Sequence, residues 1–271
     1  MKKWQKNWGI ALVSVLLAIS VAGCGKSDDA SPALANKSEK SIKDMDKIVV
    51  GIGSDAFPFG YVDTADKKTK GFDLDIAAAI VKDILGADDK IEYKDVNGKT
   101  RIPMLKNGDI DLIVKTMTIT DERKQEVDFS DPYFSAGQSL LVPTGSSIKS
   151  IDDLKGKKVI AVKGTRDGKT IQEKSPEAIV SEYENLGEAF TALSTGKGDV
   201  LTTDNAILMG LSLENPGYEL VGGVIDDQPW GIAVRKGDKE MLDAVNASLK
   251  KLKETGEYDK IYEKWLKQKP E

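Results

Sequence analysis

Short runs of β-branched residues alternate with amphipathic helical patterns from Lys47 to the end of the chain. The runs that predict strands are residues 47–53, 90–96, 109–114, 139–143, 158–163, 199–204 and 231–235. The helical patterns are residues 72–85, 187–196, 205–213 and 239–256. This alternation predicts an α/β fold with mostly parallel sheets, in which a ligand binds beyond the carboxyl ends of the strands.

A break in composition divides this pattern into two parts. After the strand at residues 139–143, the strand at residues 158–163 begins another strand–helix unit. About 70 residues later, "DDQPWGIAVRKGD" resembles a second segment that crosses between the two parts of the chain. We therefore predict two lobes joined by two strands. Lobe one comprises residues 47–138 and 231–271, and lobe two comprises residues 143–227.

The N-terminus has the features of an export signal. Lysines in "MKKWQKNW" precede an uncharged apolar run at residues 9–20, which is shorter than the roughly 20 residues that a membrane-spanning helix needs. The run ends in "VAGC", which resembles the lipobox of bacterial lipoproteins and implies a lipid on Cys24, the only cysteine of the chain. The alternative is a buried free thiol. We predict a signal peptide at residues 1–23 and a disordered tether at residues 24–46, because the tether is polar and lacks apolar periodicity.

Composition argues against several classes of function. The formal net charge is −5, and the lysines are interspersed with acidic residues, so the chain has no basic patch for nucleic acid. The chain has no histidine, which removes the commonest general base and the commonest zinc ligand. We therefore expect no metal, no cofactor and no enzymatic activity. An internal disulfide is impossible with one cysteine.

Five motifs together resemble one protein family. They are "GFDLDIAAAIVKDIL", "TITDERKQEVDFSDPYF", "LVPTGSSIKSIDDLKGKKVIAVKGT", "GDVLTTDNAIL" and "WGIAVRKGD". In this order they are similar to the extracellular solute-binding proteins of polar amino-acid ABC transporters, and the similarity covers residues 47–266. The resemblance implies a two-lobed, periplasmic-binding-protein-like fold of type II, with two hinge strands and the ligand in the cleft between the lobes.

Arg123 is the first candidate ligand-binding residue. It follows a strand and lies in T-x-T-x-x-R with Thr118, and a guanidinium can bind a carboxylate through two parallel charge-assisted hydrogen bonds. The alternative is a surface arginine paired with Glu126 or Asp128. The resemblance implies that Arg123 binds the α-carboxylate of an amino acid, and that Thr116 and Thr118 add contacts from lobe one.

The resemblance also implies contacts from lobe two. Asp204 would bind the α-ammonium group, although an aspartate between a strand and a helix is ordinarily an N-cap. Thr165 would present its amide and hydroxyl. Arg166 and Lys163 would contact the distal end of the ligand, or are ordinary surface charges. Their segment "GTRDGKT" is not a phosphate-binding loop, since only three residues separate its first glycine from Gly-Lys.

Two residues of lobe one bear on which amino acid is bound. In relatives that bind basic amino acids, an aromatic ring stands where this chain has Gly98, and relatives that bind glutamate or aspartate tend to have Thr-Arg at the place of Arg101. The resemblance thus implies that Arg101 binds a second carboxylate; the alternative is an exposed arginine at a helix start. Phe57 would pack against the ligand stem or belong to the core.

We therefore expect a lipid-anchored, extracytoplasmic and monomeric binding protein that captures glutamate or aspartate and delivers it to a membrane permease by lobe closure. One alternative is a binder of a neutral polar amino acid, glutamine or cystine. Another is a dehydratase-like enzyme on the same scaffold, in which a glutamate or lysine would replace the missing histidine as general base.

Overall fold

The structure is a computed structural model that describes residues 41–267 and residue 270. The strands form two five-stranded sheets and one small sheet. The sheet of lobe one has the order β5 (Ile91–Asp95), β1 (Ile48–Ile52), β6 (Leu112–Ile113), β13 (Ala233–Arg235) and β7 (Val127–Phe129). The sheet of lobe two has the order β10 (Ile179–Tyr183), β9 (Lys158–Val162), β11 (Val200–Asp204), β8 (Phe134–Pro143) and β12 (Tyr218–Trp230). The small sheet contains β2 (Asp55–Ala56), β3 (Gly60–Val62) and β4 (Thr69–Lys70).

The helices divide between the lobes in the same way. Lobe one carries η1 (Ile42–Asp44), α1 (Phe72–Leu85), α2 (Arg101–Asn107), α3 (Asp121–Lys124), α7 (Lys239–Glu254) and α8 (Glu257–Leu266). Lobe two carries η2 (Ile151–Leu154), α4 (Asp167–Lys174), α5 (Leu186–Ser194) and α6 (Asn205–Glu214). The α/β class and the two-lobed architecture predicted from the sequence are confirmed.

Each five-stranded sheet combines parallel and antiparallel strands, whereas the pairs of the small sheet are antiparallel. The first three strands of each five-stranded sheet are parallel, whereas β13 pairs antiparallel with β6 and β7, and β8 pairs antiparallel with β11 and β12. The prediction of mostly parallel sheets is therefore too simple. β8 and β13 adjoin the two crossings between the lobes, and at these places the chain enters a sheet from the opposite direction.

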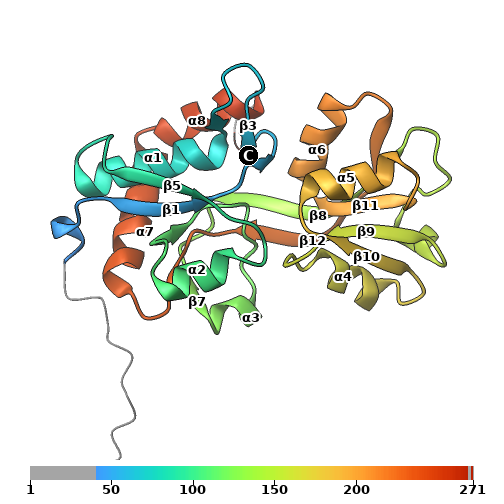
Figure 1. The fold of residues 1–271 in the computed structure, drawn as a ribbon, viewed down its shortest axis with the longest axis horizontal. Helices are drawn as coiled ribbons and strands as arrows, with labels where there is room; N and C mark the ends of the chain where they lie inside the picture. Colours follow the sequence, from blue (N-terminus) through green and yellow to red (C-terminus); the bar gives the residue numbers. More distant parts are fainter. Residues whose placement is uncertain (1–40, 268–269, 271) are drawn as a thin grey trace, which may run out of the picture. The chain divides into compact units, whose positions relative to one another are not determined.

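Two long strands connect the lobes. β8 pairs with β12 from Phe134, opposite Trp230, to Pro143, opposite Tyr218, and Figure 1 shows both strands passing toward the sheet of lobe one. Trp230 also forms an isolated bridge with Thr118 of lobe one. β8 crosses the lobe boundary placed at residue 138 from the sequence, so the residue-level boundaries stay a prediction.

Helix α1 illustrates how the sequence specifies an element. Its buried apolar positions recur three or four residues apart, as an amphipathic helix requires, and Ile76 and Ile80 are among them. Gly86 ends the helix in the left-handed conformation, at φ 75°. This face packs in the main core, whose centre is a cluster of aromatic rings. Phe134 stacks on Trp230 with 4.6 Å between ring centroids, and Phe59 meets Trp230 edge-on at 4.8 Å.

Candidate ligand-binding cleft

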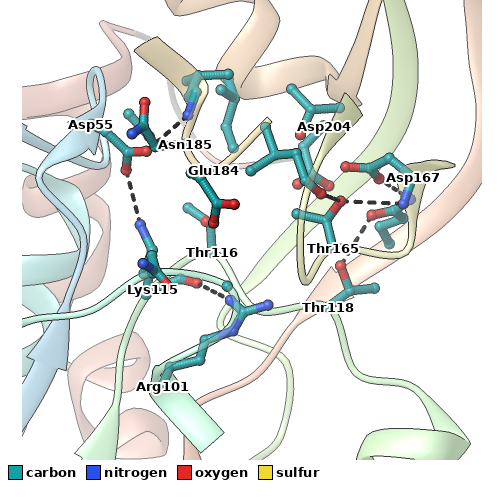
Figure 2. Close-up of a pocket in the computed structure, with 18 of the residues that line it drawn as sticks. Asp55, Arg101, Lys115, Thr116, Thr118, Thr165, Asp167, Glu184, Asn185 and Asp204 are labelled. Atoms are coloured by element: carbon teal, nitrogen blue, oxygen red, sulfur yellow. Dashed lines mark hydrogen bonds and ion pairs between the residues drawn. The ribbon is translucent and has the colours of Figure 1, made fainter. Parts of the chain in front are cut away.

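A pocket opens where the carboxyl ends of several strands of both lobes meet. Its lining is Asp55, Ala56, Asn97, Gly98, Arg101, Lys115, Thr116, Thr118 and Arg123 from lobe one, and Val162, Thr165, Asp167, Glu184, Asn185, Leu186, Thr203, Asp204, Ile207 and Gln228 from lobe two and its crossing strand. This is the place where open α/β sheets bind ligands. Figure 2 shows Asp55, Asn185 and Lys115 on one side of the pocket, and Asp167, Asp204, Thr118 and Thr165 on the other.

Arg123 is positioned by a helix cap. The hydroxyl of Thr120 accepts a hydrogen bond from the backbone N–H of Arg123 at 3.2 Å, which fixes the start of α3. The guanidinium donates to the carbonyl of Thr118 at 2.6 Å and, across the cleft, to the carbonyl of Gly164 at 3.2 Å. Neither of the acidic partners considered from the sequence binds it, since Glu126 pairs with Lys106 and Asp128 with Lys236. Burial lowers the pKa of Arg123.

Asp204 stands at the N-cap position of α6, but its side chain does not cap the helix. Its carboxylate accepts a hydrogen bond from the indole Nε1 of Trp230 at 3.2 Å. The side chain is buried, and burial together with the neighbouring Asp167 raises its pKa well above the ordinary value. The capping alternative is therefore wrong, and a cation placed beside this carboxylate would relieve the cost of its burial.

Asp167 is a pocket residue that the sequence analysis missed. Its Oδ1 accepts from Nε2 of Gln228 at 3.2 Å, while its Oδ2 has no partner among the described residues. Burial raises its pKa. Gln228 in turn accepts from the hydroxyl of Thr118 at 3.0 Å, so one buried amide on β12 connects pocket residues of both lobes. The available sequence signal was its position next to Arg166, at the start of the helix that follows β9.

Arg101 is buried, not exposed at the start of a helix. It donates to the carbonyl of Lys115 at 3.0 Å and to the carbonyl of Gly164 at 3.4 Å, and its Nε has no partner among the described residues. Burial, and then the positive charge of Arg123, lower its pKa to about 9. The two guanidinium groups therefore act in the same part of the pocket.

The other end of the pocket carries acidic and amide groups. Asp55 accepts from Nζ of Lys115 at 3.0 Å and from the backbone N–H of Leu186 in lobe two at 3.1 Å. Glu184 binds Lys99 of lobe one at 2.8 Å and also pairs with Lys163. Asn97 and Asn185 complete this end of the lining. The sequence analysis missed Asp55, Lys115 and Glu184, because no pattern pairs residues so far apart in the chain.

The three predicted threonines all line the pocket. Thr116 has a positive φ of 37°, and its backbone N–H donates to the buried carboxylate of Asp73 at 3.0 Å, which holds this unusual conformation. The hydroxyl of Thr165 donates to the carbonyl of Val162 at 2.8 Å. The geometry brings Thr116, Thr118 and Thr165 together around Arg123 and Asp204.

Three predicted residues do not line this pocket: Phe57, Arg166 and Lys163, the last of which pairs with Glu184. The ring of Phe57 packs edge-on against Tyr61 with 5.0 Å between centroids, and only its neighbour Ala56 reaches the lining. Arg166 pairs with Asp226 at 2.6 Å and lines a groove between α3 and α4 that shares Arg123 and Thr165 with the pocket. The ligand contacts of Phe57 and Arg166 stay predictions.

The described part of the chain contains neither a metal-binding cluster nor a membrane-spanning helix. Among residues 41–267 and 270, no group of three or more acidic or cysteine side chains is arranged to hold a metal ion. No helix within the same residues has the length and apolar character needed to cross a membrane. The predicted signal peptide, Cys24 and most of the predicted tether lie outside the described residues.

The chain is similar to several known amino-acid-binding proteins. An "ABC transporter glutamine-binding protein GlnH" from Bacillus subtilis (strain 168) is 53% identical over 98% of this chain and 99% of that protein. A "Glutamine-binding protein" from Geobacillus stearothermophilus is 47% identical over 87% of this chain and 94% of that protein. The solved structure of "an ancestral arginine-binding protein bound to glutamine" superposes with a TM-score of 0.78, at 42% identity, over 82% of this chain and 99% of that chain.

The sequence model of one family matches residues 48–268, which is nearly the whole described part of the chain. The resemblance found in the motifs is thus confirmed. The chain belongs to the bacterial extracellular solute-binding proteins, family 3.

Proposed function

We propose that this protein is the substrate-binding component of an amino-acid ABC importer and that its ligand is glutamine. The observation that carries the choice of ligand is the charge of the pocket. Its lining contains the cations Arg101, Lys115 and Arg123, and the anions Asp55, Asp167, Glu184 and Asp204. A lining with no excess of positive charge suits a ligand with no net charge.

The main-chain groups of the ligand are bound at the end that contains Arg123 and Asp204. Arg123 receives the α-carboxylate, because a guanidinium presents paired donors to a carboxylate. Asp204, with Asp167 nearby, receives the α-ammonium group, because a cation compensates two buried carboxylates. Thr116, Thr118 and Thr165 supply further polar contacts.

The opposite end selects the side chain. An amide needs both an acceptor for its N–H groups and a donor for its oxygen, and Asp55 together with Lys115 offers both. A glutamate carboxylate at this end would face Asp55 and Glu184, and like charges in a partly buried pocket repel. Glutamine therefore fits better than an acidic ligand.

The role expected for Arg101 changes accordingly. Its guanidinium lies close to Arg123 and binds two backbone carbonyls, so it stands at the main-chain end of the ligand. It is thus not placed to select a second carboxylate on the side chain. The names of the relatives point in the same direction, since both are called glutamine-binding, and they favour the neutral alternative over the acidic amino acids expected first.

The relatives' names also describe binding proteins and support transport over the dehydratase-like alternative. We further propose that a lipid on Cys24 anchors the protein at the outer side of the cell membrane, where the tether would let the lobes reach the permease. A monomer remains our prediction for the assembly state.

A calorimetric titration with glutamine, glutamate, aspartate, arginine and cystine tests the proposed function. Glutamine should bind tightest, and the acidic amino acids should bind at least about tenfold more weakly, which corresponds to about 1.4 kcal/mol. Tighter binding of glutamate or aspartate would show that the assignment of the ligand is wrong.

A further inference from the structure

The lobes come into close backbone contact beside the pocket at two glycines, Gly98 and Gly164. The loop that contains Gly98 follows β5 in lobe one, and the loop that contains Gly164 follows β9 in lobe two. A Cβ atom placed on Gly98 would lie 2.5 Å from the carbonyl oxygen of Lys163 and 3.2 Å from the Cα of Gly164. Real Cβ atoms do not come within 3.0 Å of a backbone oxygen, so this contact requires glycine at position 98.

The same peptide of lobe two is held by both pocket arginines. The carbonyl oxygen of Gly164 accepts from Arg123 at 3.2 Å and from Arg101 at 3.4 Å. Both distances are at the long end of the range for N–H···O hydrogen bonds. An increase of a few tenths of an ångström between the lobes would therefore weaken both bonds together.

A side chain at position 98 would clash with lobe two and not with the rest of lobe one. The three nearest neighbours of a Cβ on Gly98 are all atoms of Lys163 and Gly164, which belong to lobe two. Gly164 has a φ of +78°, a conformation that L residues rarely adopt, so changing it would strain the loop for reasons unrelated to the lobes. Gly98 is thus the position at which the contact can be tested separately from folding.

We propose that Gly98 and Gly164 form a closure contact, which sets how far the lobes approach and allows Arg101 and Arg123 to bind across the cleft. Since a ligand that contacts both lobes stabilises the closed state, a residue that holds the lobes apart weakens retention of every ligand. The inference rests on the proposed binding function but not on the identity of the amino acid.

The test compares the wild type with Gly98→Ala, Gly98→Ser and Gly98→Val by titration with each of the twenty common amino acids. The matched control is Gly187→Ala in α5, where an added Cβ meets only Oδ1 of Asn185, at an ordinary 3.5 Å. Gly98→Ala and Gly98→Ser should weaken the ligands of the wild type by roughly tenfold or more, and Gly98→Val should weaken them further. The loss should come mainly from faster dissociation, and the control should stay within about twofold.

Two results would overturn the closure contact. One is a Gly98→Ala variant that binds as tightly as the wild type. The other is a Gly98→Ala variant whose unliganded form unfolds at a clearly lower temperature than the wild type, since Gly98 would then be needed within lobe one. If the wild type prefers an amino acid other than glutamine, the proposed ligand is wrong, and the ratio between variant and wild type for the preferred ligand still tests Gly98.

Discussion

At the scale of single residues, Asp204 connects the burial of charge to ligand binding. The carboxylate is buried, its helix does not use it as a cap, and its pKa is raised by burial and by Asp167. If it binds the ligand's ammonium group, Asp204→Asn should cost roughly 2–5 kcal/mol of binding free energy for every amino-acid ligand, because a charged group loses its partner in a closed cleft. Calorimetry of the wild type and the variant measures this loss.

The same residue should make binding depend on pH. The raised pKa means that Asp204 holds a proton in the empty pocket at pH values well above its ordinary pKa of 3.8. An ammonium partner favours the ionised form, so ligand binding should release protons, and affinity should fall as the pH is lowered through the raised pKa of Asp204. Titrations in buffers of different ionisation enthalpy count the protons. Equal proton release by Asp204→Asn would assign the release to another group.

Sequence reasoning found the pocket residues that directly follow a strand in a recognisable motif. Arg123, Thr118 and Asp204 belong to this group. It missed Asp167 and Asp55, because an isolated aspartate at the start of a short element has no distinctive spacing and because its partner is supplied by another part of the chain. It found Arg101, which lines the pocket, but which end of the ligand Arg101 contacts depends on side-chain direction, a property of the packed structure.

At the scale of elements, strand β12 connects the pocket to the aromatic core through side-chain contacts. Its last residue, Trp230, donates to Asp204 and stacks on Phe134 of the other crossing strand. The second described tryptophan, Trp265, instead donates to Asp75 at 2.7 Å, near α1. Ligand binding should therefore change the fluorescence of Trp230 and leave that of Trp265 unchanged.

Steady-state emission of three proteins checks this expectation. The wild type and Trp265→Phe should change their emission on addition of glutamine, whereas Trp230→Phe should not, although calorimetry still detects binding by that variant. The reverse pattern would place the moving contact near α8. Trp4 and Trp8 lie in the predicted signal peptide, so the processed protein should carry only Trp230 and Trp265.

The long elements could be predicted, and the short ones could not. Helices α1 and α7 have enough turns for apolar periodicity to define them, and they agree closely with the predicted residues 72–85 and 239–256. Strands β2–β4 have two or three residues each, and helix α4 has one large apolar buried residue, Ile171, so their local signals are weak. The antiparallel direction of β8 and β13 follows from the path of the chain between the lobes, which no local pattern encodes.

At the scale of the whole molecule, the two lobes and their double crossing are what the alternating pattern and the family motifs predict. The pocket draws its charged groups from both lobes, and several hydrogen bonds already span the cleft, from Arg123 to Gly164 and from Leu186 to Asp55. A ligand with main-chain and side-chain groups bound in this way should shift the molecule toward its closed form, a transition for which periplasmic binding proteins are the standard example.

The most direct test of this account is small-angle X-ray scattering of the protein with increasing glutamine, and in parallel with increasing glutamate. Glutamine should reduce the radius of gyration in a saturable way, and glutamate should produce the same reduction only at concentrations at least about tenfold higher. Reduction of the radius of gyration by glutamate at lower concentrations than by glutamine, or no reduction with glutamine at any concentration, would contradict the account.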